Sequence, residues 1–172
     1  ETAFQSFIVL AIAFDQDGEV LFVSTSDGSL FAFDLKTKQI KWQLMGNNSD
    51  VVVIQFIDSL YAIITATAIN GIQLRNASNG ALIKESEVKG ASLRDLVVFP
   101  DEKRFAAVLG DGTISIWSIE HFSLAASIPS AQSLETVTVS TDGHRLAVGG
   151  GNATIQLMDS MSKNARETNT TK

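Results

Sequence analysis

The sequence contains no cysteine, only two prolines and two histidines among 172 residues, and no long apolar run. Without cysteine there is no disulfide, no zinc–thiolate site and no cysteine nucleophile. The longest apolar run, Phe7–Phe14, is far shorter than the roughly 20 residues that a membrane-spanning helix needs. Residues 1–6 before it carry no positive charge, unlike the start of a secretory signal. These absences predict a chain that makes no contact with a membrane.

The charge is acidic, with 13 Lys and Arg against 19 Asp and Glu and a net charge of −6. An acidic surface repels phosphate backbones, so nucleic acid is not an expected ligand. The absence of cysteine suits a reducing compartment and favours the cytoplasm or the nucleus. Matches to the Asn-x-Ser/Thr glycosylation pattern leave the secretory lumen open as an alternative, and they begin at Asn47, Asn76, Asn152 and Asn169.

A pattern recurs four times along the chain. Equivalent segments begin at Phe14, Phe56, Phe99 and Val139, at intervals of 42, 43 and 40 residues. A period near forty that contains several short strands is typical of a β-propeller blade. We therefore predict an all-β propeller whose blades cover 7–46, 47–90, 91–132 and 133–159, followed by a polar tail or linker over 160–172.

Each predicted blade has short strands joined by turns. In the first, the strands are 8–14, 20–24, 29–34 and 40–44, and residues such as 113–117 alternate between polar and apolar as strands do. Asp-Gly and Asn-Gly pairs supply the positive φ of tight turns, and their glycines are Gly18, Gly28, Gly71, Gly80, Gly112 and Gly143. The last repeat shows strands only at 134–140, 145–149 and 154–158, so its outer strand is expected to be missing.

Two segments carry a resemblance to a known family. Residues 110–118, which end in Trp117-Ser118, and residues 140–150 resemble the repeats of the WD-repeat family. The resemblance extends over about 8–159. It departs from the family in lacking the Gly-His dipeptide and an intact Trp-Asp pair, so the family's His–Asp–Ser/Thr–Trp hydrogen-bond network is not expected. The resemblance implies a protein–protein interaction scaffold without enzymatic activity or cofactor.

The first repeat is also similar to a second family. Residues 27–42, which end in Trp42, resemble the repeats of quinoprotein-type propellers, with Thr37-Lys38 in place of their usual Thr-Gly. That resemblance implies the alternative of a propeller enzyme with a bound cofactor, which would give purified protein a visible chromophore. We expect Trp42 and Trp117 to pack between blades rather than to bind a ligand.

Few residues suggest chemistry. Asp15-Gln16-Asp17-Gly18-Glu19 has carboxylates at the spacing that begins a calcium loop, but it lacks the distal bidentate Glu and is expected to be a turn. His121 and His144 lie in predicted turns without convergent partners and are expected to be solvated. We predict no catalytic site and no metal site.

The resemblance to WD repeats places partner binding on the loops after the second and fourth strands of each blade. The residues expected there are Ser26, Asp27, Asn48, Asp50, Asn70, Lys89, Asp111, Gln132 and Asn152. These loops are polar and mildly acidic, so the predicted partner is a protein or peptide with a basic surface.

Four blades raise the question of ring closure, because propellers have four to eight blades. The chain begins with Glu rather than Met, so it is processed or is a piece of a longer protein. Three arrangements are open: further blades of a larger ring, blades completed by self-association or by another chain, or closure of the four blades alone. A purely structural role inside a larger multidomain protein is a further alternative.

Overall fold

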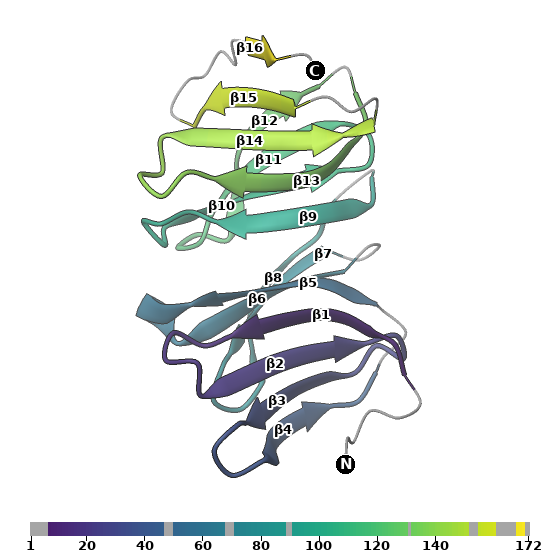
Figure 1. Ribbon diagram of the computed structural model, residues 1–172, viewed down its shortest axis with the longest axis vertical. Helices are drawn as coiled ribbons and strands as arrows, with labels where there is room; N and C mark the ends of the chain where they lie inside the picture. The colour runs from purple at the N-terminus through teal and green to yellow at the C-terminus, as the bar shows by residue number, and fades with distance from the viewer. Residues whose placement is uncertain are drawn as a thin grey trace. The chain divides into compact units, whose positions relative to one another are not determined.

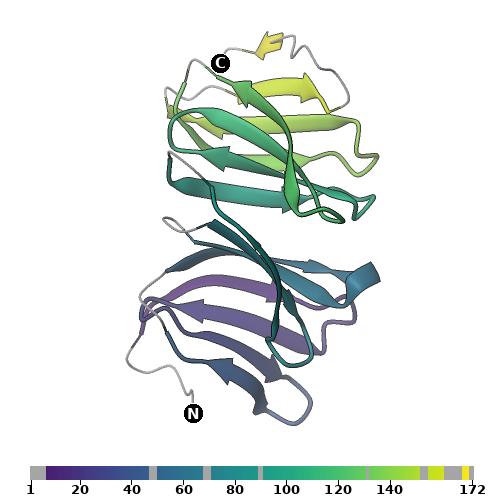
Figure 2. The same ribbon diagram turned by 180° about the vertical axis from the view of Figure 1, so that it is seen from behind.

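The computed structural model describes residues 7–46, 50–67, 71–88, 91–130, 132–151 and 155–160, and the backbone of 168–170. The chain forms two compact units, residues 1–87 (unit 1) and 88–172 (unit 2). Unit 1 contains the sheets β1–β4 and β5–β8, and unit 2 contains β9–β12 and β13–β16. Each sheet is a four-stranded antiparallel meander in which every strand pairs with its neighbours in the chain (Figures 1 and 2). The predicted all-β, blade-like architecture is confirmed.

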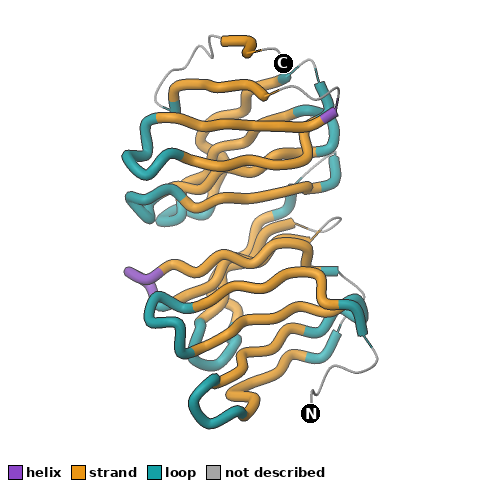
Figure 3. The backbone as a smooth tube through the Cα atoms, viewed as in Figure 1, coloured by secondary structure: helices purple, strands orange, loops and turns teal. Residues whose placement is uncertain are grey.

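The strands follow the predicted pattern closely, and most predicted boundaries are met within one or two residues. In unit 1 they are β1 Val9–Phe14, β2 Val20–Thr25, β3 Leu30–Asp34, β4 Gln39–Leu44, β5 Val51–Ile57, β6 Ala62–Thr67, β7 Gly71–Asn76 and β8 Leu82–Ser86. In unit 2 they are β9 Leu93–Val98, β10 Arg104–Leu109, β11 Thr113–Ser118, β12 Ser123–Pro129, β13 Leu134–Val139, β14 Arg145–Gly150, β15 Ile155–Asp159 and β16 Thr168–Thr170. A short 3-10 turn, Asp58–Leu60, joins β5 to β6, and strands dominate the described backbone (Figure 3).

The prediction that the last blade lacks its outer strand is wrong. β16 pairs antiparallel with β15, with Leu157 opposite Thr168 and Ile155 opposite Thr170. The sequence of this strand is polar and shows no alternation of polar and apolar residues. The outermost strand of a blade needs little such alternation, so the pattern used to predict strands was absent here. β4 and β12, for comparison, have mostly exposed residues. Main-chain pairing is enough to add such a strand to an existing sheet.

The six glycines of the predicted Asp-Gly and Asn-Gly turns all have a positive φ. The values are 69° for Gly18, 78° for Gly28, 112° for Gly71, 73° for Gly80, 87° for Gly112 and 72° for Gly143. Lys38, in the place of the usual glycine, also has a positive φ of 59°. The turn chemistry read from the sequence is therefore confirmed.

Each unit has its own core between its two sheets. In unit 1, Phe22, Leu30, Ala32, Ile54 and Ile63 form the centre of the buried cluster. In unit 2, the corresponding cluster contains Val108, Ile114, Leu146, Val148 and Met158. Apolar residues from both sheets thus bury one another, which is the main source of stability for stacked sheets.

β-bulges recur at the same place in successive sheets. The pairing of the third and fourth strands shifts register at Ala32/Phe33, at Leu74/Arg75 and at Ile116/Trp117. Bulges bend a strand and re-aim the side chains next to them. Phe33, Arg75 and Trp117 occupy equivalent positions, immediately beside these bulges.

Candidate functional site

The predicted partner-binding loops lie at one end of the strands in each unit. In unit 1, the β2–β3 turn carries Ser26 and Asp27, and Asp50 precedes β5. In unit 2, the β10–β11 turn carries Asp111, and Gln132 lies between β12 and β13. Asn48, Asn70, Lys89 and Asn152 lie outside the described residues.

In each unit, a glycine allows two neighbouring loops at this end of the strands to approach closely. A Cβ on Gly46 would lie 1.7 Å from the carbonyl oxygen of Asp27, and a Cβ on Gly112 would lie 2.3 Å from that of Gln132. The amide of Gly46 also donates to the Ser29 hydroxyl at 3.2 Å. Only glycine allows the backbones to approach this closely. Within each unit, the turn after the second strand and the connection after the fourth strand therefore form one continuous surface, which we call the loop rim of that unit.

Asp27 organises its own turn. Its Oδ1 accepts hydrogen bonds from the Thr25 hydroxyl at 2.7 Å and the Ser29 amide at 3.1 Å, and its Oδ2 accepts from the Ser29 hydroxyl at 3.0 Å. The bond from the Thr25 hydroxyl is the main cause that lowers the pKa of Asp27 below its ordinary value. Both carboxylate oxygens are therefore engaged within the turn.

The other described rim residues differ in how they are held. Asp50 and Asp111 are exposed, and Asp111 Oδ1 accepts from the Thr113 amide at 2.9 Å. Ser26 is exposed, and its hydroxyl accepts from the Ile8 amide at 3.1 Å. Gln132 is half-buried, and its backbone N–H donates to the Ser130 hydroxyl at 3.3 Å. Among the predicted rim residues that the structure describes, Ser26, Asp50 and Asp111 are thus the most open to a partner.

A pocket of about 530 Å³ in unit 1 was not anticipated from the sequence. The first sheet contributes Gly28, Leu30, Gln43, Leu44 and Met45, and the second contributes Val51, Thr67, Gln73, Arg75 and Glu85. Burial lowers the pKa of Arg75, and the negative charge of Glu85 opposes that shift. The sequence did hold one signal: the position of Arg75 is occupied by Phe33, Trp117 and Met158 in the other repeats.

A second hollow, of about 360 Å³, lies at the other end of unit 1. It is lined by the ends of β1 and β5, including Phe14 and Phe56, and by the β1–β2 turn. In that turn Asp15 Oδ1 accepts from the amides of Glu19 at 2.8 Å and Val20 at 3.0 Å. This contact shows how Asp15 caps a turn, the structural role expected for the calcium-like segment.

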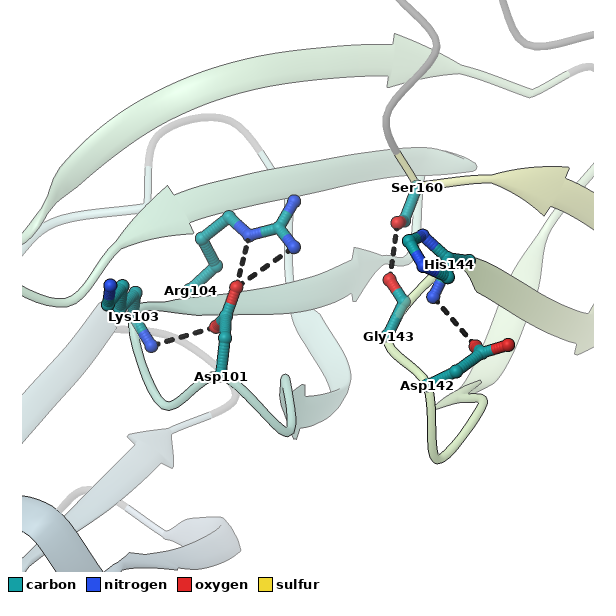
Figure 4. Close-up of polar contacts among 7 residues, drawn as sticks. All are labelled: Asp101, Lys103, Arg104, Asp142, Gly143, His144 and Ser160. Carbon is teal, nitrogen blue, oxygen red and sulfur yellow. Dashed lines mark hydrogen bonds and ion pairs between the residues drawn. The ribbon is translucent and has the colours of Figure 1, made fainter.

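The turns at the corresponding end of unit 2 are also held by aspartates (Figure 4). Asp101 accepts from the Lys103 amide at 2.8 Å and from Arg104 Nε at 3.0 Å, and Asp142 accepts from the His144 amide at 2.9 Å. Ser160 donates from its hydroxyl to the Gly143 carbonyl. His121 and His144 are both exposed. Across the described residues, no three His, Cys, Asp or Glu side chains are placed to hold a metal ion.

The two tryptophans have different surroundings. Trp42 Nε1 on β4 donates to the Ala77 carbonyl of the next sheet at 2.8 Å, and its ring faces Gly80. This contact confirms that Trp42 packs between the sheets of unit 1. Trp117 is 5% exposed and its ring is stacked on Phe105 at 5.8 Å. Its Nε1 has no hydrogen-bond partner in the described part of the chain. Trp117 therefore takes no part in a WD-type network there.

Comparisons with known proteins agree with this architecture. A model of the family "WD domain, G-beta repeat" matches residues 2–34. The chain is 28% identical to the protein HIR1 of Chaetomium globosum over 100 residues, which are 58% of this chain and 8% of that protein. It is 22% identical to telomerase protein component 1 of Rattus norvegicus over 139 residues, which are 81% of this chain and 5% of that protein.

The chain thus spans less than a tenth of the length of either relative. The described residues include no helix long and apolar enough to cross a membrane. The matches support a protein-interaction scaffold as a general role. Together with the four sheets, they confirm the resemblance to WD repeats found in the sequence.

Proposed function

We propose that this chain is a non-catalytic scaffold in which the loop rim of each unit binds a basic segment of a partner protein. The observation that carries the proposal is the fixed geometry of the rim, in which Gly46 rests against the Asp27 carbonyl and Gly112 against that of Gln132. Loops held by a rigid sheet framework are suited to recognition because little order is lost on binding. The exposed carboxylate of Asp50 supplies negative charge to the rim of unit 1, and that of Asp111 supplies it to the rim of unit 2.

The test compares two charge-reversed proteins. A fluorescein-labelled peptide of alternating Lys and Ser, with a Glu/Ser peptide of the same length, is titrated against the chain. Asp50→Lys/Asp111→Lys should weaken binding of the Lys peptide by about tenfold or more and reduce its salt dependence. Asp27 is left intact because its carboxylate holds the turn.

The matched control changes net charge equally at the other end of the strands, in Asp17→Lys/Glu120→Lys. Long-range attraction alone would weaken binding equally in both double variants, and that result would overturn a specific rim site. Unchanged binding by Asp50→Lys/Asp111→Lys would overturn it as well.

A second candidate function is structural, as blades that complete a larger ring. Ile12 on β1 is 60% exposed and Phe14 is 55% exposed, and Ile155 on β15 is 57% exposed. Blades normally bury such faces against a neighbour, so exposed apolar strands favour packing against further blades or a second copy. Light scattering after size-exclusion chromatography should show association that Ile12→Ser/Phe14→Ser abolishes. A monomer at all concentrations would exclude pairing with a second copy.

A further inference from the structure

The pocket between the two sheets of unit 1, which we call the interblade groove, combines a charged group with an apolar wall. Its apolar side consists of Leu30, Leu44, Met45 and Val51. Leu30 and Val51 are buried, Leu44 is half-buried and Met45 is 73% exposed. The groove therefore has a buried apolar floor and an exposed side chain, Met45, at its mouth.

Arg75 supplies the positive charge. Its Nε and Nη2 donate to Gln73 Oε1 at 3.1 and 2.8 Å, and its Nη1 donates to the Gly80 carbonyl at 3.0 Å. These bonds fix the guanidinium plane. Five N–H groups are available on an arginine, so a further N–H on Nη1 and one on Nη2 are not used by these three bonds. No carboxylate in the described residues forms an ion pair with Arg75.

A comparison of the repeats shows that this arginine is not required by the fold. The equivalent residue of unit 2 is Met158, which is buried in the core between its two sheets. Placing a half-buried guanidinium there costs desolvation that an apolar residue avoids. A residue that breaks the local pattern in this way often marks a binding function.

We propose that the interblade groove binds an extended peptide segment of a partner protein in which an acidic side chain adjoins an apolar side chain. The acidic group pairs with the free N–H groups of Arg75, and the apolar group packs on Leu44 and Met45. A carboxylate and a guanidinium match in geometry as well as in charge. This site goes beyond the proposed rim function because it selects the opposite charge. The groove adjoins the rim of unit 1 at Gly28 and Met45, and it extends from there to Arg75.

Glu85 sharpens the proposal, because it also lines the groove and faces the same ligand. For an acidic ligand, the Glu85 carboxylate is a repulsive neighbour that lowers affinity. For an amide or a basic ligand, the same carboxylate would be an acceptor that raises affinity. Glu85→Gln therefore separates these ligand classes by the direction of its effect.

The experiment is an NMR titration of the chain labelled with ¹³C at the methionine methyl groups. The probe is the peptide acetyl-Ala-Leu-Glu-Leu-Ala-amide. One matched peptide has Gln in place of Glu, and another has Ala in place of both Leu residues. The Met45 methyl reports on the groove, and the methyl of Met158, buried in unit 2, serves as an internal control.

We expect a saturable shift of Met45 alone. The Gln peptide should bind about tenfold more weakly because it loses one charge-assisted contact. The peptide without Leu should also bind more weakly, because it loses apolar contact with the groove. Arg75→Met should abolish the shift, Arg75→Lys should retain part of it, and Glu85→Gln should tighten binding. An unchanged Met158 signal in each variant shows that unit 2 stays folded. The proposal is overturned by equal binding of the Glu and Gln peptides, by binding that survives Arg75→Met, or by weaker binding in Glu85→Gln. None of these variants alters the loop rim, so failure here leaves the rim proposal to its own test.

Discussion

Unit 1 joins its two sheets with aromatic rings and side-chain hydrogen bonds, whereas unit 2 joins its sheets mainly with aliphatic side chains. In unit 1, the ring centroid of Phe22 on β2 lies 6.0 Å from that of Phe56 on β5. The Ser24 hydroxyl donates to the Val51 carbonyl at 2.8 Å, and Trp42 Nε1 donates to the Ala77 carbonyl at 2.8 Å. In unit 2, the core residues include Ile114, Leu146 and Val148.

Unit 2 has a polar link of its own. Asp95 Oδ2 on β9 accepts from the Thr136 hydroxyl at 2.8 Å and from the Val137 amide at 3.0 Å on β13. The same stacking of sheets is therefore reached by two kinds of contact. Strand pairing and turn chemistry specify the blade, while the residues between blades are free to vary, and one such variation is Arg75.

The largest expected effect tests the aromatic junction. Phe22→Ala removes a fully buried ring at the centre of the unit 1 core and should lower the free energy of unfolding by about 3–5 kcal/mol. Urea denaturation followed by circular dichroism measures the change. The matched control is Phe14→Ala. Because Phe14 is 55% exposed, this substitution should lower the free energy of unfolding far less. Equal losses would show that the junction does not depend on Phe22.

The two tryptophans allow the polar part of the comparison to be tested. Benzothienylalanine replaces the indole N–H by sulfur and keeps the shape of the ring. At position 42 it should destabilise the chain by about 1–3 kcal/mol, because the buried Ala77 carbonyl loses its donor. At position 117 it should be neutral or stabilising, because the N–H has no described partner. Thermal melting measures both, and a loss of the same size at both positions would contradict the distinction.

Glycine substitutions in the turns between the third and fourth strands should change the stability of the two units in opposite directions, by smaller amounts. Lys38 in unit 1 and Phe122 in unit 2 both have positive φ, 59° and 49°. Lys38→Gly should stabilise the chain by about 0.5–1 kcal/mol, because glycine adopts this conformation without strain. Phe122→Gly should destabilise it, since Phe122 is buried and its ring packs 5.9 Å from Phe105. Destabilisation by Lys38→Gly in a thermal melt would refute the strain argument.

The smallest expected effect concerns pH. Hydrogen bonds from the hydroxyls of Thr25 and Ser140 are the main causes that lower the pKa values of Asp27 in unit 1 and Asp142 in unit 2. Their folded values lie below the ordinary value of about 3.9, so their contribution is complete above that pH and is lost as pH falls through the folded value. Asp27→Asn and Asp142→Asn should each lower the melting temperature at neutral pH, and the difference from the parent should vanish in acid. A difference independent of pH would exclude this ionisation as its source.

Strands and turns were predictable because their signals are local. Alternation within a few residues located β11, and the Asp27-Gly28 and Asp111-Gly112 pairs located turns with positive φ. β16 was not predicted, because an outer strand is held by main-chain pairing and its sequence needs no apolar pattern.

The interblade groove could not be predicted from local signals. Met45 and Arg75 are far apart in the sequence, and they line one pocket only because two sheets stack. The repeat alignment did show an arginine where apolar residues are usual, but it could not show that Gln73 and the Gly80 carbonyl fix its guanidinium. The loop rim was placed by resemblance, yet the engagement of both Asp27 oxygens within the turn became visible only with side chains in place.

The meander order of the sheets has a consequence for how the chain acquires its structure. Each strand pairs only with strands adjacent in sequence, so no sheet must wait for a distant segment. Short loops close at a small entropic cost, and topologies dominated by such closures fold faster than other all-β folds of similar size. During synthesis, the sheet β1–β4 can form once residues up to Leu44 have left the ribosome, and it then offers β5 a finished surface. The blade is thus a unit of folding order as well as of architecture.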